Sequence, residues 1–145
     1  MKPYENLKCV GLPTKNTLKV YFIGAGPGDL ELLTIKALNI IRKADIVIYA
    51  GSLVNKDILK FAKKAAVSYD SAKMTLEEVL GVIKKEKSNK KIIARLHTGD
   101  PSLYGAIQEQ MDWCEKEGIA YEVVPGVSSF QAAAASLRQE FTLPG

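Results

Sequence analysis

Residues 18–29 read LKVYFIGAGPGD, and the order of residue types in them indicates the fold class. The run LKVYFI is rich in apolar and aromatic residues, as a buried strand is, and glycines end it at once. Residues 31–43 follow with apolar side chains at helical spacing, from Leu33 to Ile41. The stretch therefore predicts a strand, a glycine-rich loop and a helix in succession.

The same succession returns along the rest of the chain. Thr75 and Glu78 have the spacing of a capping box, which predicts a helix start there. Strands that alternate with helices imply right-handed crossovers and a mostly parallel sheet with helices on both faces, so the predicted fold class is α/β. The further strands are expected at 46–49, 66–69, 91–96 and 120–124, and the further helices at 56–64, 75–87, 104–117 and 129–137.

Length and composition narrow the class of protein. With 145 residues, one compact domain is expected, here residues 18–145, preceded by an N-terminal extension at 1–17 that shows no clear period. No stretch approaches the roughly 18 apolar residues of a membrane helix. Cys9 and Cys114 stand far apart, which argues against a disulfide framework or a cysteine zinc site and favours the reducing cytoplasm. The net charge of +4 permits anionic ligands but does not indicate nucleic acid.

The glycines point to a ligand site. In a parallel sheet the loops after the strands emerge at one carboxyl edge, where open α/β proteins bind ligands. Any one of these glycines could serve only to turn the chain, but four loops together favour a shared site. The glycines are Gly24, Gly26 and Gly28 after the first strand, Gly51 after the second, Gly99 after the fourth and Gly126 after the fifth.

Common ligand motifs do not fit these loops. A dinucleotide fingerprint would need glycine where Asp29 stands, and Pro27 lacks the N–H that would face a pyrophosphate. His97 is the only histidine, which disfavours a Ser-His-Asp triad and a transition-metal site. Asp100, between Gly99 and a proline, is either a positioned functional carboxylate or an N-cap of the next helix, and both roles can coexist.

Four ordered motifs carry a resemblance to a known family. The chain resembles the tetrapyrrole methyltransferases, which transfer methyl groups from S-adenosyl-L-methionine to corrinoid precursors. Within the family the motifs are most similar to the branch that methylates C11 of precorrin-4, with or without cobalt. Another family acceptor (a different corrin precursor, uroporphyrinogen III or a diphthamide precursor) and a non-catalytic binding domain are the alternatives. The motifs are GAGPGD at 24–29, ADIVIYAGSLV at 44–54, RLHTGDPSLYGA at 95–106 and VVPGVSSFQAAAA at 123–135.

The resemblance implies an architecture and a site. Residues 18–145 would be the N-terminal domain of a two-domain enzyme that works as a homodimer on a small tetrapyrrole. From the residues themselves, we expect no metal, nucleic acid or membrane to be involved. The methyl donor would lie in the cleft between the domains and leave as S-adenosyl-L-homocysteine. Asp100 would be the essential carboxylate that orients cofactor or substrate. The implied cofactor contacts are Pro27, Thr98, Gly99, Asp100, Leu103, Ser128 and Ser129.

Overall fold

The computed structural model describes residues 17–142, and within them one parallel sheet forms the centre of the fold. Its order is β3-β2-β4-β1-β5, so β3 and β5 form the edges and β4 lies in the middle. All neighbouring strands run parallel, which confirms the predicted α/β class. The strands are β1 (Lys19–Gly24), β2 (Ile46–Tyr49), β3 (Val67–Asp70), β4 (Ile92–His97) and β5 (Ala120–Val124).

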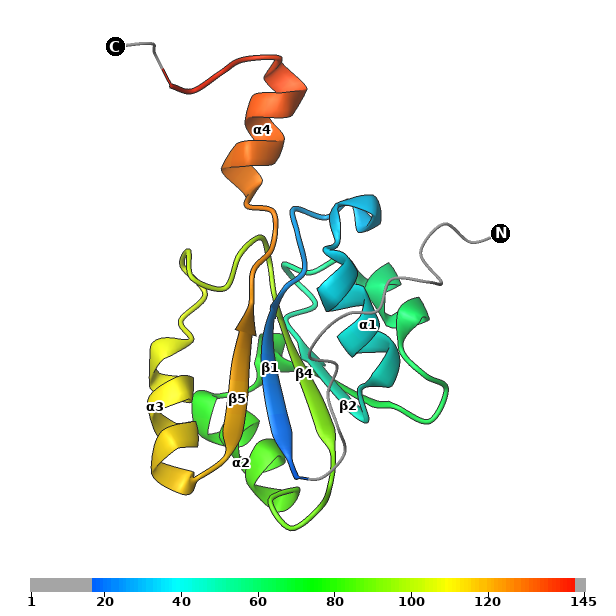
Figure 1. Cartoon of the computed structure of the whole chain (residues 1–145), viewed down its shortest axis with the longest axis vertical. Helices are drawn as coiled ribbons and strands as arrows, with labels where there is room; N and C mark the ends of the chain where they lie inside the picture. The colour runs from blue at the N-terminus through cyan, green and yellow to red at the C-terminus, as the bar shows by residue number, and fades with distance from the viewer. Residues whose placement is uncertain (1–16, 143–145) are drawn as a thin grey trace.

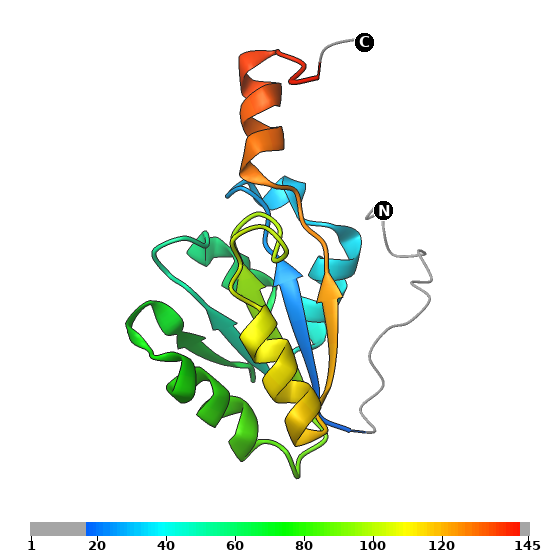
Figure 2. The same cartoon turned by 90° about the vertical axis from the view of Figure 1, so that its left-hand side faces the viewer.

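Helices cover both faces of this sheet (Figures 1 and 2). One face packs against α1 (Ile35–Lys43) and the 3-10 helix η2 (Lys56–Phe61), and the other packs against α2 (Leu76–Lys85) and α3 (Gln108–Glu117). Successive β1 side chains alternate between the two cores because strand side chains point to opposite faces in turn. The central strands are thus buried on both faces, as parallel sheets require.

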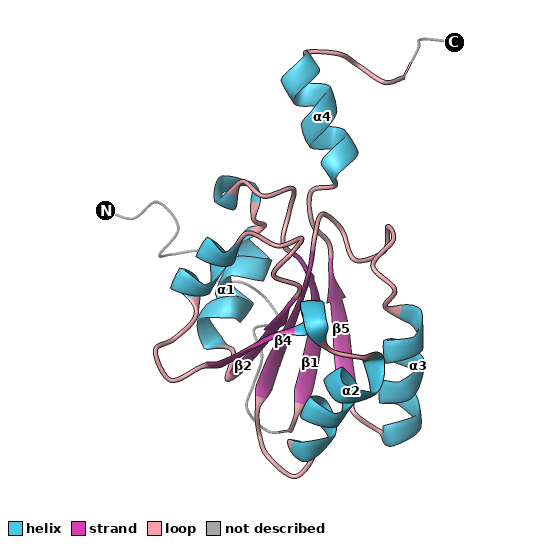
Figure 3. Cartoon of the chain, turned by 180° about the vertical axis from the view of Figure 1, so that it is seen from behind, coloured by secondary structure: helices cyan, strands magenta, loops and turns pink. Residues whose placement is uncertain are grey.

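Two shorter helices and one protruding helix complete the fold. The 3-10 helices η1 (Leu30–Leu32) and η3 (Ser71–Lys73) follow β1 and β3 at the carboxyl edge of the sheet. Helix α4 (Ser129–Leu137) leaves the same edge after β5 and stands clear of the sheet and the other helices (Figure 3). The carboxyl edge therefore carries both the glycine loops and an exposed helix.

Three predicted helices differ from the structure at their starts or in type. Thr34 accepts a hydrogen bond from the backbone N–H of Ala37 and starts α1 there, four residues later than predicted. The helix predicted at 56–64 is the 3-10 helix η2. The helix predicted from Tyr104 begins at Gln108, because Tyr104 (φ 57°) and Ala106 (φ 48°) have left-handed backbone that an α-helix cannot contain.

The helix start predicted at Thr75 is confirmed. The capping box of Thr75 and Glu78 is present and opens α2.

The predicted N-terminal extension lies, apart from Thr17, outside the described residues. Among residues 17–142, none of the helices combines the length and apolar character needed to cross a bilayer. Across the same residues, no three His, Cys, Asp or Glu side chains gather where they could hold a metal ion.

Candidate functional site

Glycines from three loops touch one another at the carboxyl edge. Gly26 and Gly99 form a short antiparallel bridge, with backbone N to O distances of 3.2 and 2.8 Å. A Cβ atom on Gly24 would lie 2.6 Å from the carbonyl oxygen of Gly99, and one on Gly126 would lie 2.7 Å from the Cα of Gly24. Side chains are therefore excluded at this junction, and the loops after β1, β4 and β5 are held at backbone contact.

Asp100 joins two of these loops through both of its carboxylate oxygens. Its Oδ2 accepts a hydrogen bond from the backbone N–H of Gly126 at 2.9 Å, and its Oδ1 accepts from that of Ser102 at 2.8 Å. The alternative of an N-cap for the following helix is wrong, because α3 begins only at Gln108 and has Ile107 at its N-cap. Asp100 instead fixes the position of the loop after β5 relative to the loop after β4.

Ser128 begins the protruding helix α4. It is 7% exposed and forms a capping box with Gln131, whose side-chain oxygen accepts from the Ser128 N–H at 3.1 Å. Ser129 is the first residue of the helix and is exposed. The cap places both serines directly beside the glycine junction, since a Cβ atom on Gly99 would lie 3.5 Å from the Ser128 Cα.

These loops enclose one side of a pocket of about 270 Å³, which we call the Asp100 pocket. Six of the seven predicted contact residues line it, whereas Pro27 does not and only its neighbour Gly26 reaches the junction. Sequence reasoning missed two exposed aromatic residues, because nothing in the motifs separates a pocket rim from any other loop position. The lining residues are Thr98, Gly99, Asp100, Leu103, Ser128 and Ser129 together with Tyr104 and Phe130.

Gly51, in the loop after β2, does not line the Asp100 pocket, contrary to the expectation of one shared site, although Asn55 of the same loop donates its Nδ2 to the Gly28 carbonyl at 2.9 Å. Gly51 donates its N–H to Oδ1 of Asp70 at 2.8 Å, and a Cβ atom on Gly51 would lie 2.9 Å from the Asp70 carboxyl carbon. Hydrogen bonds from the N–H groups of Ala72 and Gly51 hold the pKa of Asp70 below its usual range. Gly51 thus serves the junction between the β2 and β3 loops.

His97, the last residue of β4, is buried just below the Asp100 pocket loop. Its ring packs against that of Phe22 with centroids 6.1 Å apart, and its Nε2 has no hydrogen-bond partner among the described residues. Burial lowers the pKa of His97 to about 3, and the nearby Arg95 charge adds to this effect. The imidazole is therefore neutral at physiological pH and does not line the pocket.

Comparison with known proteins assigns the chain to a family. The sequence model of the tetrapyrrole (corrin/porphyrin) methylases matches residues 19–145. The chain belongs to this family. It is 56% identical over 129 residues to a cobalt-precorrin-4 C(11)-methyltransferase of Methanocaldococcus jannaschii, a match that covers 89% of this chain and 50% of that protein.

Solved structures of tetrapyrrole methylases share the fold. A cobalt precorrin-4 methyltransferase described as a cobalamin biosynthetic enzyme matches with a TM-score of 0.85 and 45% identity, covering 92% of this chain and 56% of that one. The uroporphyrin-III C-methyltransferase of Thermus thermophilus, solved with S-adenyl homocysteine, matches with a TM-score of 0.67 and 34% identity over 80% of this chain and 48% of that one. The chain spans about half the length of the relatives it matches.

Proposed function

We propose that residues 18–145 form the N-terminal half of an S-adenosyl-L-methionine-dependent enzyme that methylates cobalt-precorrin-4 or precorrin-4 at C11 in cobalamin biosynthesis. The observation that carries the proposal is the Asp100 pocket at the carboxyl edge, in a chain 56% identical to a protein of that name. The relatives are about twice as long, which supports a second domain as part of the working enzyme.

The Asp100 pocket fits one wall of a site for the methyl donor. Gly99 carries no side chain, and the atom nearest to a Cβ built there lies 3.5 Å away, so a ligand can approach its backbone closely. Thr98 and Ser129 offer hydroxyl groups, while the exposed Leu103 and Phe130 offer apolar surface for the uncharged parts of a nucleoside thioether. These are the components that small-molecule sites combine: apolar walls with a few placed polar groups.

The size of the pocket is consistent with a site completed by a second domain. Pockets for drug-sized ligands hold roughly 300–1,000 Å³ and bury most of the ligand surface. The Asp100 pocket holds about 270 Å³, just below that range. A ligand seated here would therefore keep much of its surface in water until another wall covers it.

Methyl transfer requires the protein to align the donor and the acceptor more than it requires reactive side chains. The donor, when bound, supplies a methyl group to a carbon nucleophile by direct displacement at a sulfonium. Asp100 keeps the two loops in register, and each of its oxygens retains a lone pair after the backbone bonds to Ser102 and Gly126. We assign Asp100 the role of orienting the ligand, because near-attack geometry contributes much of the rate in such reactions.

The proposal is tested by methyl transfer in the proposed two-domain protein, in which a second domain follows this chain; we call it the longer protein. We expect methyl groups from labelled S-adenosyl-L-methionine to appear in precorrin-4 or its cobalt form, and we expect the Asp100→Asn variant to bind S-adenosyl-L-homocysteine about tenfold more weakly, because the amide loses one backbone hydrogen bond. Wild-type affinity and turnover in that variant would remove Asp100 from its role. Transfer to uroporphyrinogen III alone would keep the family and change the acceptor.

The quaternary structure and cellular location are part of the same proposal. We expect a homodimer in the cytoplasm, the first from the family resemblance and the second from the sparse, separated cysteines. Cys114 is buried and forms no disulfide, as in a protein that keeps its thiols reduced. Sedimentation of the longer protein at several concentrations checks the dimer.

A further inference from the structure

A largely buried, positively charged side chain lies outside the Asp100 pocket. Arg95 projects from β4 toward the α2 and α3 face, where its Nη1 donates to Oγ of Ser71 at 2.9 Å and its buried Nε has no partner among the described residues. None of the carboxylates among residues 17–142 forms an ion pair with it. Burial lowers the pKa of Arg95 only to about 10, so the guanidinium stays charged at neutral pH.

A desolvated charge without a counter-ion is expensive, which makes Arg95 a candidate for ligand binding. A buried ion costs free energy to desolvate unless a partner compensates it. Ser71 Oγ is a single neutral acceptor whose position is fixed by its own hydrogen bond to the Tyr49 carbonyl at 3.2 Å. The guanidinium has five N–H donors, so most of its capacity remains free for an anion.

A second pocket of about 280 Å³ lies against this guanidinium, and we call it the Arg95 pocket. It lies beside the N-terminal ends of α2 and α3, and the α2 end is already occupied by the capping box of Thr75 and Glu78. A helix N-terminus carries a partial positive charge that favours an anion. The α3 end has no side-chain cap of its own. The lining residues are Ser71, Met74, Thr75, Leu76, Val79, Arg95, Gly105, Ala106, Glu109 and Gln110.

Gln110 supplies a second polar atom without a partner in the same pocket. The residue is 4% exposed, its Nε2 donates to the Ala106 carbonyl at 3.0 Å, and its Oε1 has no partner within residues 17–142. The Arg95 Nε and the Gln110 Oε1 are both shielded from solvent, so a ligand in the pocket would meet the rest of the guanidinium rather than these two atoms. Glu109 is the one acidic residue of the lining, and it is exposed, so water and salt screen its charge far more than that of Arg95.

We propose that the Arg95 pocket binds a carboxylate side chain of the tetrapyrrole substrate, with the Arg95 guanidinium as its anchor. The inference rests on the proposed function and deepens it, because it assigns the acidic substrate to a place in this half of the enzyme. A planar guanidinium matches a carboxylate with two parallel hydrogen bonds.

The loop between β4 and α3 connects the two pockets. Leu103 and Tyr104 line the Asp100 pocket, while Gly105 and Ala106 line the Arg95 pocket. The loop is closely folded, since a Cβ atom on Gly105 would lie 2.8 Å from the carbonyl carbon of Pro101. Residues of one loop therefore line both pockets.

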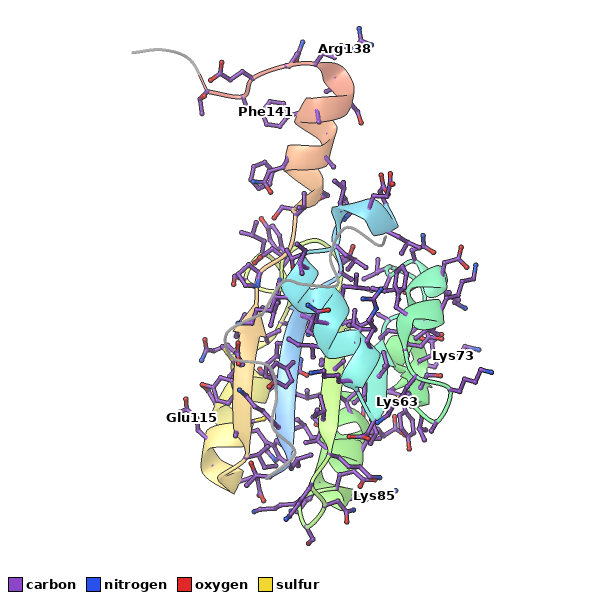
Figure 4. All side chains as sticks on the ribbon, turned by 45° about the vertical axis from the view of Figure 1, so that its right-hand side comes forward. Lys63, Lys73, Lys85, Glu115, Arg138 and Phe141 are labelled. Atoms are coloured by element: carbon purple, nitrogen blue, oxygen red, sulfur yellow. The ribbon has the colours of Figure 1, made fainter. Side chains whose placement is uncertain are left out.

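Titration with uroporphyrin, a stable and fluorescent tetrapyrrole rich in carboxylates, tests the proposal on the 145-residue chain. We expect Arg95→Met to weaken binding by at least about tenfold, as loss of charged hydrogen bonds does. Arg95→Lys should fall between, because an ammonium cannot form the planar pair. Lys85→Met is the matched control: it removes the same charge from an exposed residue at the far end of the molecule from α4 (Figure 4) and should change affinity by less than about twofold.

A second measurement needs no variant that might fail to fold. In the wild-type chain, the Arg95 Nε–H signal in a ¹⁵N correlation spectrum should shift on adding uroporphyrin, and free succinate should reverse the shift. An unmoved signal, or equal losses of affinity in Arg95→Met and Lys85→Met, would overturn the assignment.

Binding of S-adenosyl-L-homocysteine separates this inference from the proposed function. In the longer protein, Arg95→Met should retain wild-type affinity for it, and an equal loss there would mean that Arg95 only supports the fold. If wild-type protein binds uroporphyrin through Arg95 but does not bind S-adenosyl-L-homocysteine, the carboxylate site stands and the methyl-donor proposal fails.

Discussion

At the scale of single residues, the carboxyl edge is defined by positions that have no side chain. Gly24, Gly99 and Gly126 come from three loops and pack backbone against backbone. The sequence marks each of them as a loop residue, but contact between residues so far apart depends on the strand order, which no local pattern contains. The same holds for Arg95, which reads as one more residue of a strand until its partners are seen.

The glycine junction predicts an asymmetric pair of substitutions. Gly126→Ala should lower the free energy of unfolding by about 1–3 kcal/mol, because the new Cβ meets backbone atoms that cannot rotate away. Gly81→Ala in α2 should raise it by up to about 1 kcal/mol, since nothing lies within 4 Å and alanine favours helix. Urea unfolding of both variants provides the measurement, and a Gly126→Ala chain as stable as wild type would refute the close packing.

His97 predicts a pH dependence of stability. Its pKa is about 3 in the folded chain against an ordinary value of 6.5, so just below pH 6.5 only the unfolded chain takes up the proton. Stability is therefore full above pH 6.5 and is lost as pH falls toward 3. Between pH 7 and pH 5 the loss from this group is about 2 kcal/mol.

The test compares urea unfolding of wild type and His97→Gln at about pH 7, 6 and 5. Wild type should lose stability more steeply than the variant, which lacks the titrating group. Parallel pH curves would show that the imidazole is not held neutral in the folded protein.

At the scale of elements, the spacing of apolar residues predicts the positions of the strands accurately and the starts of the helices less accurately. The five strands lie within a residue or so of the predicted ranges, because runs of β-favouring residues are bounded by glycine or charge. The start of α3 is not predicted, because apolar spacing contains no sign of the left-handed backbone at Tyr104 and Ala106. The start of α2 was predicted, since a capping box is a local signal between Thr75 and Glu78.

The capping box of Thr75 and Glu78 leads to a prediction about the stability of the chain. Thr75→Ala removes the acceptor of the Glu78 N–H bond and should cost about 1 kcal/mol of stability. Ser88→Ala, at an exposed turn position beyond the end of α2, should change stability by less than about 0.5 kcal/mol. Thermal and urea unfolding of the two variants decide it: equal effects would mean that the cap contributes nothing.

At the scale of the whole molecule, α4 protrudes from the sheet and the other helices, and large apolar side chains on and after α4 are exposed. Leu137 is 63% exposed. Phe141, which lies just beyond the helix and is labelled in Figure 4, is 54% exposed. Uncovered apolar surface promotes association. We expect the 145-residue chain to self-associate with rising concentration. Leu137→Gln combined with Phe141→Gln should weaken this association at least about tenfold.

Sedimentation velocity measures that association. The control is Val67→Gln on the edge strand β3, which removes an exposed apolar side chain away from α4 and should leave association unchanged. If the α4 variant sediments like wild type at every concentration, this surface does not drive association.

The central claim is that the carboxyl edge of this sheet provides half of a site for the methyl donor. Calorimetric titration of S-adenosyl-L-homocysteine into the 145-residue chain and into the longer protein, with NAD as the control ligand, tests it most directly. We expect saturable binding to the longer protein, weak or no binding to the shorter chain, and no heat with NAD. Absence of S-adenosyl-L-homocysteine binding in both proteins, or binding of NAD in its place, would show that this edge is not part of a methyl-donor site.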